Sequence, residues 1–334
     1  MQTLPPLRER VTIALEDARL GELLERGTVR YANARRASID ALPHGEALRD
    51  RARTIRLTAL ANLDRYIEQL AGNVERRGGT VYWASDAAAA NRYVVDLARR
   101  RQVRSVVKSK SMLSEEIHLN AALAAAGVEA VETDLGEYIV QLAGETPAHI
   151  VAPAIHKTKE QVADLFAERL GIPRTDSIPE LTAAARRVLR ERFLSAGMGV
   201  SGVNFAVAET GTIVTVTNEG NGRFCTTTPP IHVALMGIER VVPTMDDLLV
   251  LLQVLARSAT GQQISVYTNL VTGPARPGEP DGPEELHLVL VDNGRSRVLG
   301  SEYAEALACI RCGACLNACP VYRAIGGHAY GGVY

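Results

Sequence analysis

The sequence predicts an α/β fold in which a mainly parallel sheet is covered by helices. From residue 80 onward, short β-rich runs alternate with amphipathic helical segments, which is typical of parallel strands joined by crossover helices. Helical periodicity without strand signals precedes this region, and a run of cysteines follows it. We therefore divide the chain into a helical N-terminal segment (1–75), an α/β domain (76–300) and a C-terminal cysteine-containing appendage (301–334).

The individual elements follow from apolar periodicity. Residues 11–25 and 46–73 repeat apolar side chains at three- and four-residue steps, so both segments are expected to be helical. Further helices are expected at 87–100, 115–126, 159–170, 178–196, 245–258 (with Thr244 as N-cap) and from about 301. Strands are expected at 80–84, 105–108, 128–132, 149–153, 203–208, 212–217, 232–238, 264–268 and 286–291. The stretch 273–283, rich in proline and glycine, should be an exposed loop.

The composition is that of an ordinary globular protein. Of 334 residues, 22% are charged, and the formal net charge is −1, which argues against disorder and against a global basic surface for nucleic acid. The arginine-rich stretches 49–56 and 99–104 have helical spacing and are best explained as solvated helix faces. Without a signal peptide or an apolar span, the protein is expected to be cytoplasmic, with no membrane span and no nucleic-acid partner.

The C-terminal cysteines carry the strongest chemical signal. Their spacing, C-x2-C-x2-C-x3-C-P, is the pattern by which bacterial ferredoxins bind a [4Fe-4S] cluster. Zinc sites usually need two cysteine pairs further apart, and cytosolic thiols stay reduced, so zinc and disulfides are weaker interpretations. We expect an iron-sulfur cluster bound by Cys309, Cys312, Cys315 and Cys319.

The fourth ligand of this cluster is open. In two-cluster ferredoxins the cysteine before the proline binds the other cluster, but this sequence has no second motif, and Cys225 is its only other cysteine. The ligand could come from Cys319, Cys225, a partner chain or a non-protein group, or the chain could be a C-terminally truncated form of a longer protein. We expect truncation, because the glycine-rich tail 326–334 is typical of a loop that leads onward. One cluster is then expected here, and a second would need residues that this sequence lacks.

Polar residues gather between 197 and 223, at the ends of apolar strands. Strand ends form the crevice where open α/β sheets bind ligands, although 218–222 could simply be a tight hairpin turn. The density of polar side chains favours a ligand site. Its candidate residues are Asn204, Glu209, Thr210, Asn218, Glu219, Asn221 and Arg223.

Several residues could serve a small organic anion. Lys108, Lys110 and Arg223 could bind a carboxylate or phosphate. Glu209 could act as a base or cap a turn, and His156 could shuttle protons or cap a helix. No G-x-G-x-x-G follows a strand, since the glycine cluster 197–202 precedes one, so we do not expect a complete nicotinamide or flavin dehydrogenase. Cys225 is expected to be a packed or free thiol.

Several ordered segments resemble the LUD domain: 108–112, 133–138, 153–156, 208–212 and 217–223. Followed by the ferredoxin-type motif, they resemble the iron-sulfur subunits of the three-component bacterial lactate utilization system. The resemblance implies a fold similar to the NagB/RpiA/CoA-transferase group, a cytoplasmic location and a role, with two sister subunits, in oxidising L-lactate to pyruvate. The resemblance also implies two [4Fe-4S] clusters bound through two cysteine motifs, whereas this sequence contains one motif.

The main hypothesis is an electron-transfer component, one subunit of an oxidoreductase complex. Arg311, inside the cysteine loop, could raise the cluster's potential or be merely solvated. One alternative is a ligand-binding or subunit-assembly module whose cluster is structural. Another is an enzyme resembling CoA-transferases or sugar-phosphate isomerases, which rests on fold analogy alone.

Overall fold

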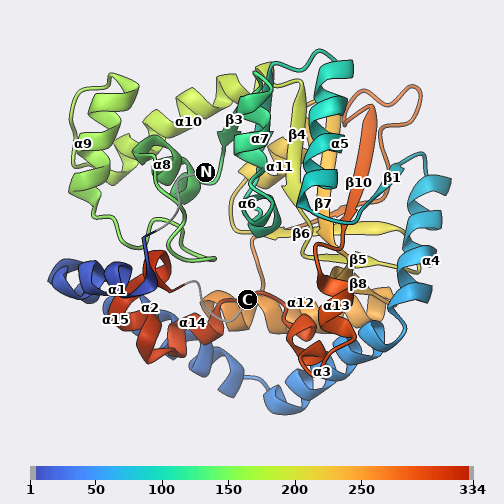
Figure 1. The fold of residues 1–334 in the computed structure, drawn as a ribbon, viewed down its shortest axis with the longest axis horizontal. Coiled ribbons are helices and arrows are strands. Elements are labelled where there is room, and N and C mark those ends of the chain that lie inside the picture. The colour runs from blue at the N-terminus through green and yellow to red at the C-terminus, as the bar shows by residue number, and fades with distance from the viewer. Residues whose placement is uncertain (1–4, 331–334) are drawn as a thin grey trace.

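A six-stranded parallel sheet forms the centre of the computed structural model, which describes residues 5–330. Its strand order is β1-β10-β7-β4-β2-β3, and every neighbouring pair is parallel (Figure 1). The predicted fold class, a mainly parallel sheet covered by helices, is confirmed. The strands are β1 Thr80–Ala84, β2 Ser105–Lys108, β3 Glu129–Glu132, β4 Met198–Gly202, β7 Ile231–Gly237 and β10 Glu285–Val291.

A second, four-stranded sheet packs across the first. Its order is β8-β5-β6-β9, with antiparallel pairing on both sides of β6. Alternate side chains face opposite layers: Ile213 packs on the large sheet, whereas Phe205 and Val214 pack on α12 (Met245–Thr260) and α3 (Gly45–Ala61). The strands are β5 Phe205–Val207, β6 Thr212–Thr217, β8 Val241–Val242 and β9 Tyr267–Val271.

Helices cover the large sheet on both faces and at one edge. One face carries α5 (Ala87–Arg100), α6 (Met112–Glu116) and α7 (Leu119–Ala125), and the other carries α4 (Leu63–Arg76) beside the small sheet. A third layer lies beyond β3, toward the side of the molecule that carries α9 and α10 (Figure 1). That layer contains α8 Leu135–Ala143, α9 Lys159–Leu170 and α10 Ile178–Ser195, and its apolar core continues to α11 Asn221–Thr227, which packs on β4.

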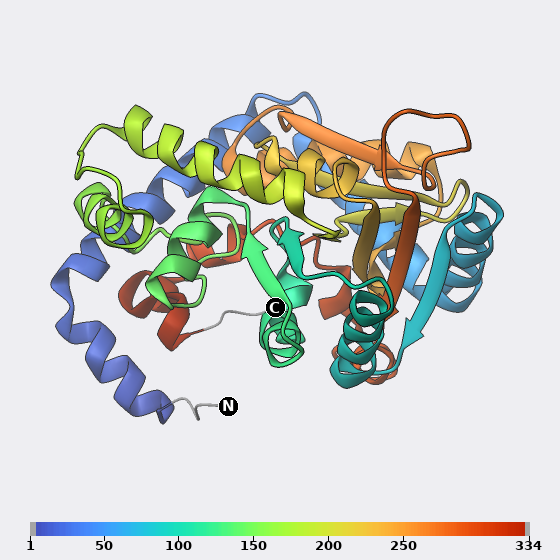
Figure 2. The same ribbon diagram turned by 90° about the horizontal axis from the view of Figure 1, so that it is seen from above.

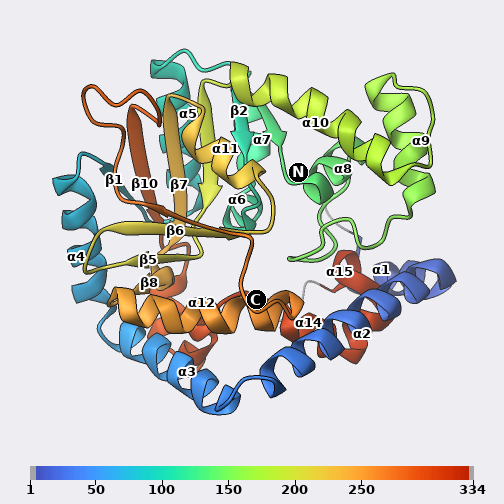
Figure 3. The same cartoon turned by 180° about the vertical axis from the view of Figure 1, so that it is seen from behind.

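The two ends of the chain pack against each other. The long helix α2 (Ala18–Asp40) lies side by side with α14 (Ala314–Ala318) and α15 (Pro320–Ala329) (Figure 3). Leu24, Leu316 and Tyr322 form the buried contact between them. Seen from above, the blue N-terminal helices run along one side of the molecule (Figure 2). The remaining elements are α1 Leu7–Glu16, α13 Arg295–Leu299, η1 Ile238–Arg240 and η2 Ala304–Ala308.

Many predicted elements are confirmed with their bounds. β1, β2, β6, α5 and α9 match the expected residues, and the expected strands near 128, 232 and 286 are within one residue of β3, β7 and β10. Thr244 caps α12 by accepting a hydrogen bond from Asp247 N (3.1 Å). The loop 273–283 contains no helix or strand.

Other elements differ from the prediction. The strand expected at 149–153 is wrong, because His149 Nδ1 accepts hydrogen bonds from Val151 N and Ala152 N and folds this stretch into turns. The helix expected at 115–126 is broken between α6 and α7, where His118 has a left-handed backbone (φ 55°). The strand expected at 264–268 begins at Tyr267 instead.

The glycine cluster 197–202 precedes the strand β5, as expected, but most of it forms a further strand, β4, that was not predicted. A Cβ atom on Gly199 would lie 1.7 Å from the carbonyl oxygen of Cys225, so only glycine allows α11 to pack this closely on β4. The interpretation of 218–222 as a hairpin turn is also wrong, because Asn221 begins helix α11.

Candidate functional site

The cysteine motif occupies a loop and two short helices. The loop follows η2, and its backbone is left-handed at Arg311 (φ 54°) and Gly313 (φ 77°). A Cβ atom on Gly313 would lie 3.1 Å from Ile150, so the turn packs tightly on the loop 144–158. This conformation turns the chain back on itself between successive thiols of the set Cys309, Cys312, Cys315 and Cys319.

Backbone N–H groups point at the thiols. Arg311 N donates to Cys309 Sγ at 3.3 Å, and Tyr322 N donates to Cys319 Sγ at 3.5 Å. Burial raises the pKa of Cys312 and of Cys315, while backbone hydrogen bonds to each thiol oppose this shift. Hydrogen bonds to the charged form of a sulfur favour the thiolate, and in iron-sulfur proteins they tune the reduction potential.

The type and spacing of the donors fit an iron-sulfur cluster. Such a cluster takes one cysteine per iron, and both the spacing of the thiols and the N–H···S bonds suit that arrangement. Within residues 5–330, no group of three His, Cys, Asp or Glu side chains is arranged to hold a metal ion.

Two buried arginines fasten the cysteine loop to the α/β domain. Arg56, on α3, donates to Val241 O (3.0 Å) and Leu307 O (3.1 Å) and also to Glu239 O. Arg240 donates to Cys309 O (3.0 Å). Burial lowers the pKa of Arg56 to about 10, so the guanidinium stays charged at neutral pH and holds the loop at the end of the sheet.

A charged network surrounds Arg311 of the loop. Arg295 donates to Glu239 Oε2 (2.7 Å) and to both oxygens of Glu116 (2.9 and 2.8 Å). Burial alone would raise the pKa of Glu116, but hydrogen bonds from Arg295 and Asn293 lower it to about 2. The Arg311 guanidinium lies 3.5 Å from Glu116 Oε2 and 4.0 Å from Glu239 Oε1. Arg311 is thus part of a protein network and not merely solvated.

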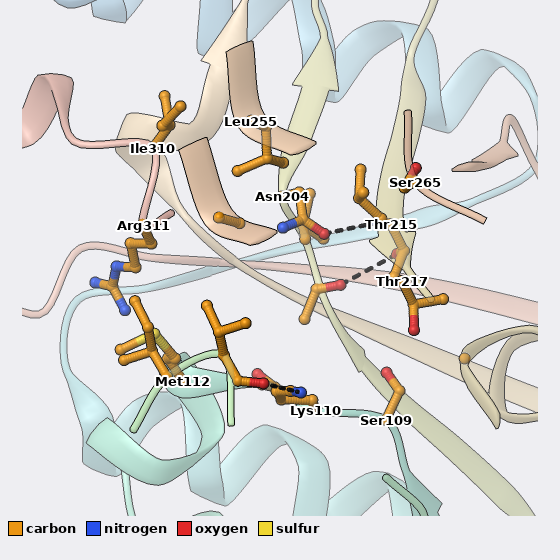
Figure 4. A pocket seen from close by; sticks show the side chains of 18 of the residues that line it. Ser109, Lys110, Met112, Asn204, Thr215, Thr217, Leu255, Ser265, Ile310 and Arg311 are labelled. Carbon is orange, nitrogen blue, oxygen red and sulfur yellow. Dashed lines mark hydrogen bonds between the residues drawn. The ribbon is translucent and has the colours of Figure 1, made fainter. Parts of the chain in front are cut away.

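A cavity of about 240 Å³ lies beside this loop, at the carboxyl ends of the parallel strands. After β2 the chain proceeds to β3 on one side and returns to β4 on the other, so the strand order reverses between β2 and β4. Such a switch point is where open α/β sheets bind ligands. Figure 4 shows Ile310 and Arg311 on one side of the cavity, Met112 and Lys110 below them, and Asn204 and Thr217 across from them.

Lys110, Asp134 and Glu219 form a second charged group in the cavity wall. Lys110 Nζ donates to Asp134 Oδ2 (2.8 Å) and to Val151 O (3.2 Å). Partial burial and the neighbouring Asp134 carboxylate raise the pKa of Glu219 to about 7. Burial would raise the pKa of Asp134 as well, but Lys110 lowers it. Near neutral pH this group can therefore offer a carboxylate and an exchangeable proton side by side.

The predicted amides also line the cavity, and each has a structural partner. Asn204 Oδ1 accepts from Val216 N (2.8 Å), and Asn218 Nδ2 donates to Gln262 Oε1 (2.6 Å). Asn221 Nδ2 donates to the Thr133 hydroxyl (3.3 Å), and its Oδ1 is a buried atom without a partner among the described residues. A bound ligand could supply the missing donor.

Lys108 lies behind the cavity wall and does not line it. Its side chain is fully buried, and its Nζ donates to Glu132 Oε1 (2.6 Å) and Asn120 Oδ1 (2.7 Å). Burial would lower the pKa of Lys108, but the adjacent carboxylates, chiefly Glu132, raise it. The structure therefore gives this lysine a buried carboxylate as its counter-ion and leaves it no access to an anion in the cavity.

The other predicted site residues lie outside the cavity lining. Glu209 Oε2 accepts from Met245 N (3.2 Å), the first residue of helix α12, so its observed partner lies 36 residues away and not in the turn after its own strand. The Thr210 hydroxyl bonds Thr212 (2.7 Å). The Arg223 guanidinium lies 6.0 Å from the centroid of the Tyr267 ring. His156 Nε2 bonds Glu145 (2.7 Å), and burial lowers its pKa despite that bond.

Cys225 is a core residue. It is fully buried within the layer around α10 and α11, where its Sγ lies 3.3 Å from the Thr133 hydroxyl. Burial raises the pKa of its thiol to about 12. The expectation of a packed thiol agrees with this environment.

Sequence reasoning missed the arginines around the cysteine loop. Arg240 and Arg295 follow β7 and β10 within a few residues, so strand-end position could have indicated both. Arg56 lies in the middle of a helix, 251 residues before its partner Leu307, and no local signal marks it.

Comparison with known proteins identifies two regions. Residues 67–291 match the LUD domain, and residues 305–334 match a 4Fe-4S dicluster domain. Lactate utilization protein B of Bacillus licheniformis is 49% identical over 328 residues, which are 98% of this chain and 69% of that protein. The protein named uncharacterized electron transport protein YkgF, of Escherichia coli, is 49% identical over 327 residues, again 98% of this chain and 69% of that protein.

Two further findings concern a solved structure and the lengths of the helices. The crystal structure of a duf162 family protein from Deinococcus radiodurans aligns with a TM-score of 0.37 and 13% identity, covering 69% of this chain and 98% of that one. None of the helices between residues 5 and 330 combines the length and the apolar character that crossing a membrane requires.

Proposed function

The chain belongs to the LUD-domain family, together with the lactate utilization B proteins, and from that premise we propose that it is an electron-transfer subunit of an L-lactate-oxidising system. It relays electrons as lactate becomes pyruvate, in the cytoplasm and together with sister subunits. The names of its relatives, which include lactate utilization and electron transport, support this assignment. The observation that carries the proposal is a cysteine loop with N–H···S bonds, held at the ligand-binding edge of the sheet.

Cys309, Cys312, Cys315 and Cys319 would hold one [4Fe-4S] cluster in this chain. When bound, such a cluster supplies one-electron transfer at a potential that the surrounding protein sets. Cys309 and Cys315 are exposed, whereas Cys312 and Cys319 are half-buried. The exposed side of the loop can approach a redox partner, and the buried side rests on α2 and α12.

The residues around the loop have two tasks. Arg56 and Arg240 fix its backbone through carbonyl hydrogen bonds, so the thiols keep their positions when the charge at the site changes. Arg240 also places positive charge near Cys309, and Arg311 carries a further positive charge in the same loop. Cationic neighbours stabilise the reduced, more negative state of a redox centre and so raise its potential.

The proposal is tested by measuring iron and acid-labile sulfide per chain after anaerobic reconstitution, with EPR spectra after dithionite reduction. We expect about four irons per chain and a reducible signal. Cys312→Ala should lose both. Cys225→Ala, which alters a core thiol away from the loop, should keep both.

Electron relay itself needs a second measurement. The reconstituted chain is mixed anaerobically with its sister subunits and L-lactate, and reduction is followed by the same EPR signal. Reduction that requires both lactate and the sister subunits would support the relay. A cluster that dithionite reduces but lactate never does would argue for a structural cluster.

A further inference from the structure

Arg311 differs from the other cations of the cavity because its guanidinium has ion pairs but no hydrogen bond among the described residues. Lys110, Arg240 and Arg295 each make hydrogen bonds to a carboxylate or a carbonyl. Among the residues that the structure describes, the Arg311 guanidinium makes only ion pairs of 3.5 and 4.0 Å and no hydrogen bond. Its five N–H donors are therefore available to a ligand.

The charge balance around Arg311 points the same way. Three guanidinium groups (Arg240, Arg295 and Arg311) share the two nearest carboxylates (Glu116 and Glu239), while Asp134 and Glu219 lie with Lys110 in another part of the same cavity wall. Both oxygens of Glu116 already accept hydrogen bonds from Arg295. Glu116 is thus a weak competitor for Arg311, and an added carboxylate could accept the hydrogen bonds that the Arg311 guanidinium does not make within the protein.

One part of the cavity wall is suited to an apolar body. Its volume is about 240 Å³, whereas an apolar cavity of about 150 Å³ already binds benzene. A three-carbon acid would therefore leave much of the space empty. The apolar side chains that line it include Met112, Ile150, Val216, Leu255, Ala259 and Ile310.

We infer that this cavity binds an organic carboxylate with an apolar body at least as large as a six-membered ring, and that Arg311 is the anchor for the carboxylate. The Asn221 Oδ1 atom, buried and unpartnered among the described residues, can accept a hydrogen bond from a polar group on the ligand. Because Arg311 lies between Cys309 and Cys312 in the chain, the ligand sits next to the cysteine loop.

Binding of this carboxylate is coupled to the redox state of the cluster, an inference that rests on the proposed function. A bound carboxylate cancels the charge of Arg311 and so disfavours adding an electron to a cluster on the adjacent thiols. The ligand should therefore lower the reduction potential. By linkage, it must bind the oxidised protein more tightly than the reduced protein.

The binding step is tested by isothermal titration calorimetry of the full chain with 2-naphthoate. 2-Naphthamide, which has the same ring system and no charge, serves as the ligand control. We expect the amide, and the variant Arg311→Gln, to bind at least about tenfold more weakly, the loss typical of a charged hydrogen bond. Arg223→Gln, which removes an arginine outside the cavity, should bind 2-naphthoate like the unaltered chain.

A second variant keeps the test decisive if Arg311→Gln disturbs the loop. Ala259→Phe fills the cavity from α12, leaves all four cysteines and Arg311 unaltered, and should abolish binding. Equal affinity in Ala259→Phe and the unaltered chain would overturn the proposed site. Because calorimetry does not depend on electron flow, this outcome is distinguishable from a failure of the electron-relay proposal.

The coupling is tested by potentiometric titration of the reconstituted chain, followed by EPR. We expect the midpoint potential to fall when 2-naphthoate saturates the site. In Arg311→Gln the midpoint should be lower from the start and should not respond to the ligand. A midpoint that is identical with and without bound ligand would overturn the coupling.

Discussion

Lys108→Met tests whether the buried ion pair behind the cavity is structural. Lys108 is fully buried, and the Glu132 side chain is 6% exposed, with 2.6 Å between the ammonium and the carboxylate. Removing one partner of such a pair leaves a buried charge uncompensated and costs about 3–5 kcal/mol. We expect about 3 kcal/mol, the lower limit, because Glu132 keeps a hydrogen bond from Asn120 Nδ2 (2.7 Å) and borders a second cavity.

The assay is urea unfolding at pH 7, followed by far-UV circular dichroism. The double variant Lys108→Met/Glu132→Met removes both charges and should recover most of the lost stability, since apolar replacements of buried pairs are often neutral. Lys159→Met, at a position where the lysine side chain is 51% exposed, should change stability by less than about 0.5 kcal/mol. A loss below about 1 kcal/mol in Lys108→Met, or no recovery in the double variant, would refute this reasoning.

Two further predictions concern close packing and proton binding. Gly199→Ala should unfold the protein or prevent its accumulation, because the new Cβ atom would lie 1.7 Å from Cys225 O. The control Gly21→Ala, whose new Cβ atom would have nothing within 4 Å, should leave the thermal unfolding midpoint equal or higher. A folded Gly199→Ala protein would contradict the packing of α11 on β4. Glu219, with its pKa raised to about 7, binds its proton more tightly in the folded state than in the unfolded chain, where its pKa is about 4.3. The stability that this proton adds is present below about pH 4.3 and is lost as the pH rises through about 7. In urea titrations, the free energy of unfolding of the unaltered chain, relative to that of Glu219→Gln, should therefore fall across that window. A difference that stays constant with pH would contradict the raised pKa of Glu219.

Sequence patterns predicted correctly those helices and strands whose ends are marked by neighbouring residues. β6 and α5 have the expected bounds because apolar periodicity and turn residues mark their ends. β4 escaped prediction because its glycines are required by close tertiary contacts: a Cβ at Gly199 would meet Cys225 of helix α11, and one at Gly202 would meet Ser111. A glycine needed for a close approach has the same sequence signal as a glycine in a loop.

The candidate site shows the same division. The cysteine spacing is local and could be recognised from eleven consecutive residues, 309–319. The pairing state of each lysine is not local: Lys108 and Lys110 are two residues apart, yet only Lys110 lines the cavity. The sequence of β2 and of the residues that follow it cannot show this difference, because the partners of the two lysines lie elsewhere. Lys108 pairs with Glu132 in the neighbouring strand β3, and Lys110 pairs with Asp134, just after β3.

The position of the cysteines depends on the α/β domain. The elements that carry or flank them, α14 and α15, are 5 and 10 residues long, and isolated helices shorter than about 12–15 residues are marginal in water. Their order therefore comes from contacts with α2 and from the hydrogen bonds of Arg56 and Arg240 to the loop. Since Ile310 and Arg311 belong both to that loop and to the cavity wall, whatever holds the thiols in place also shapes the cavity, and neither can move without the other.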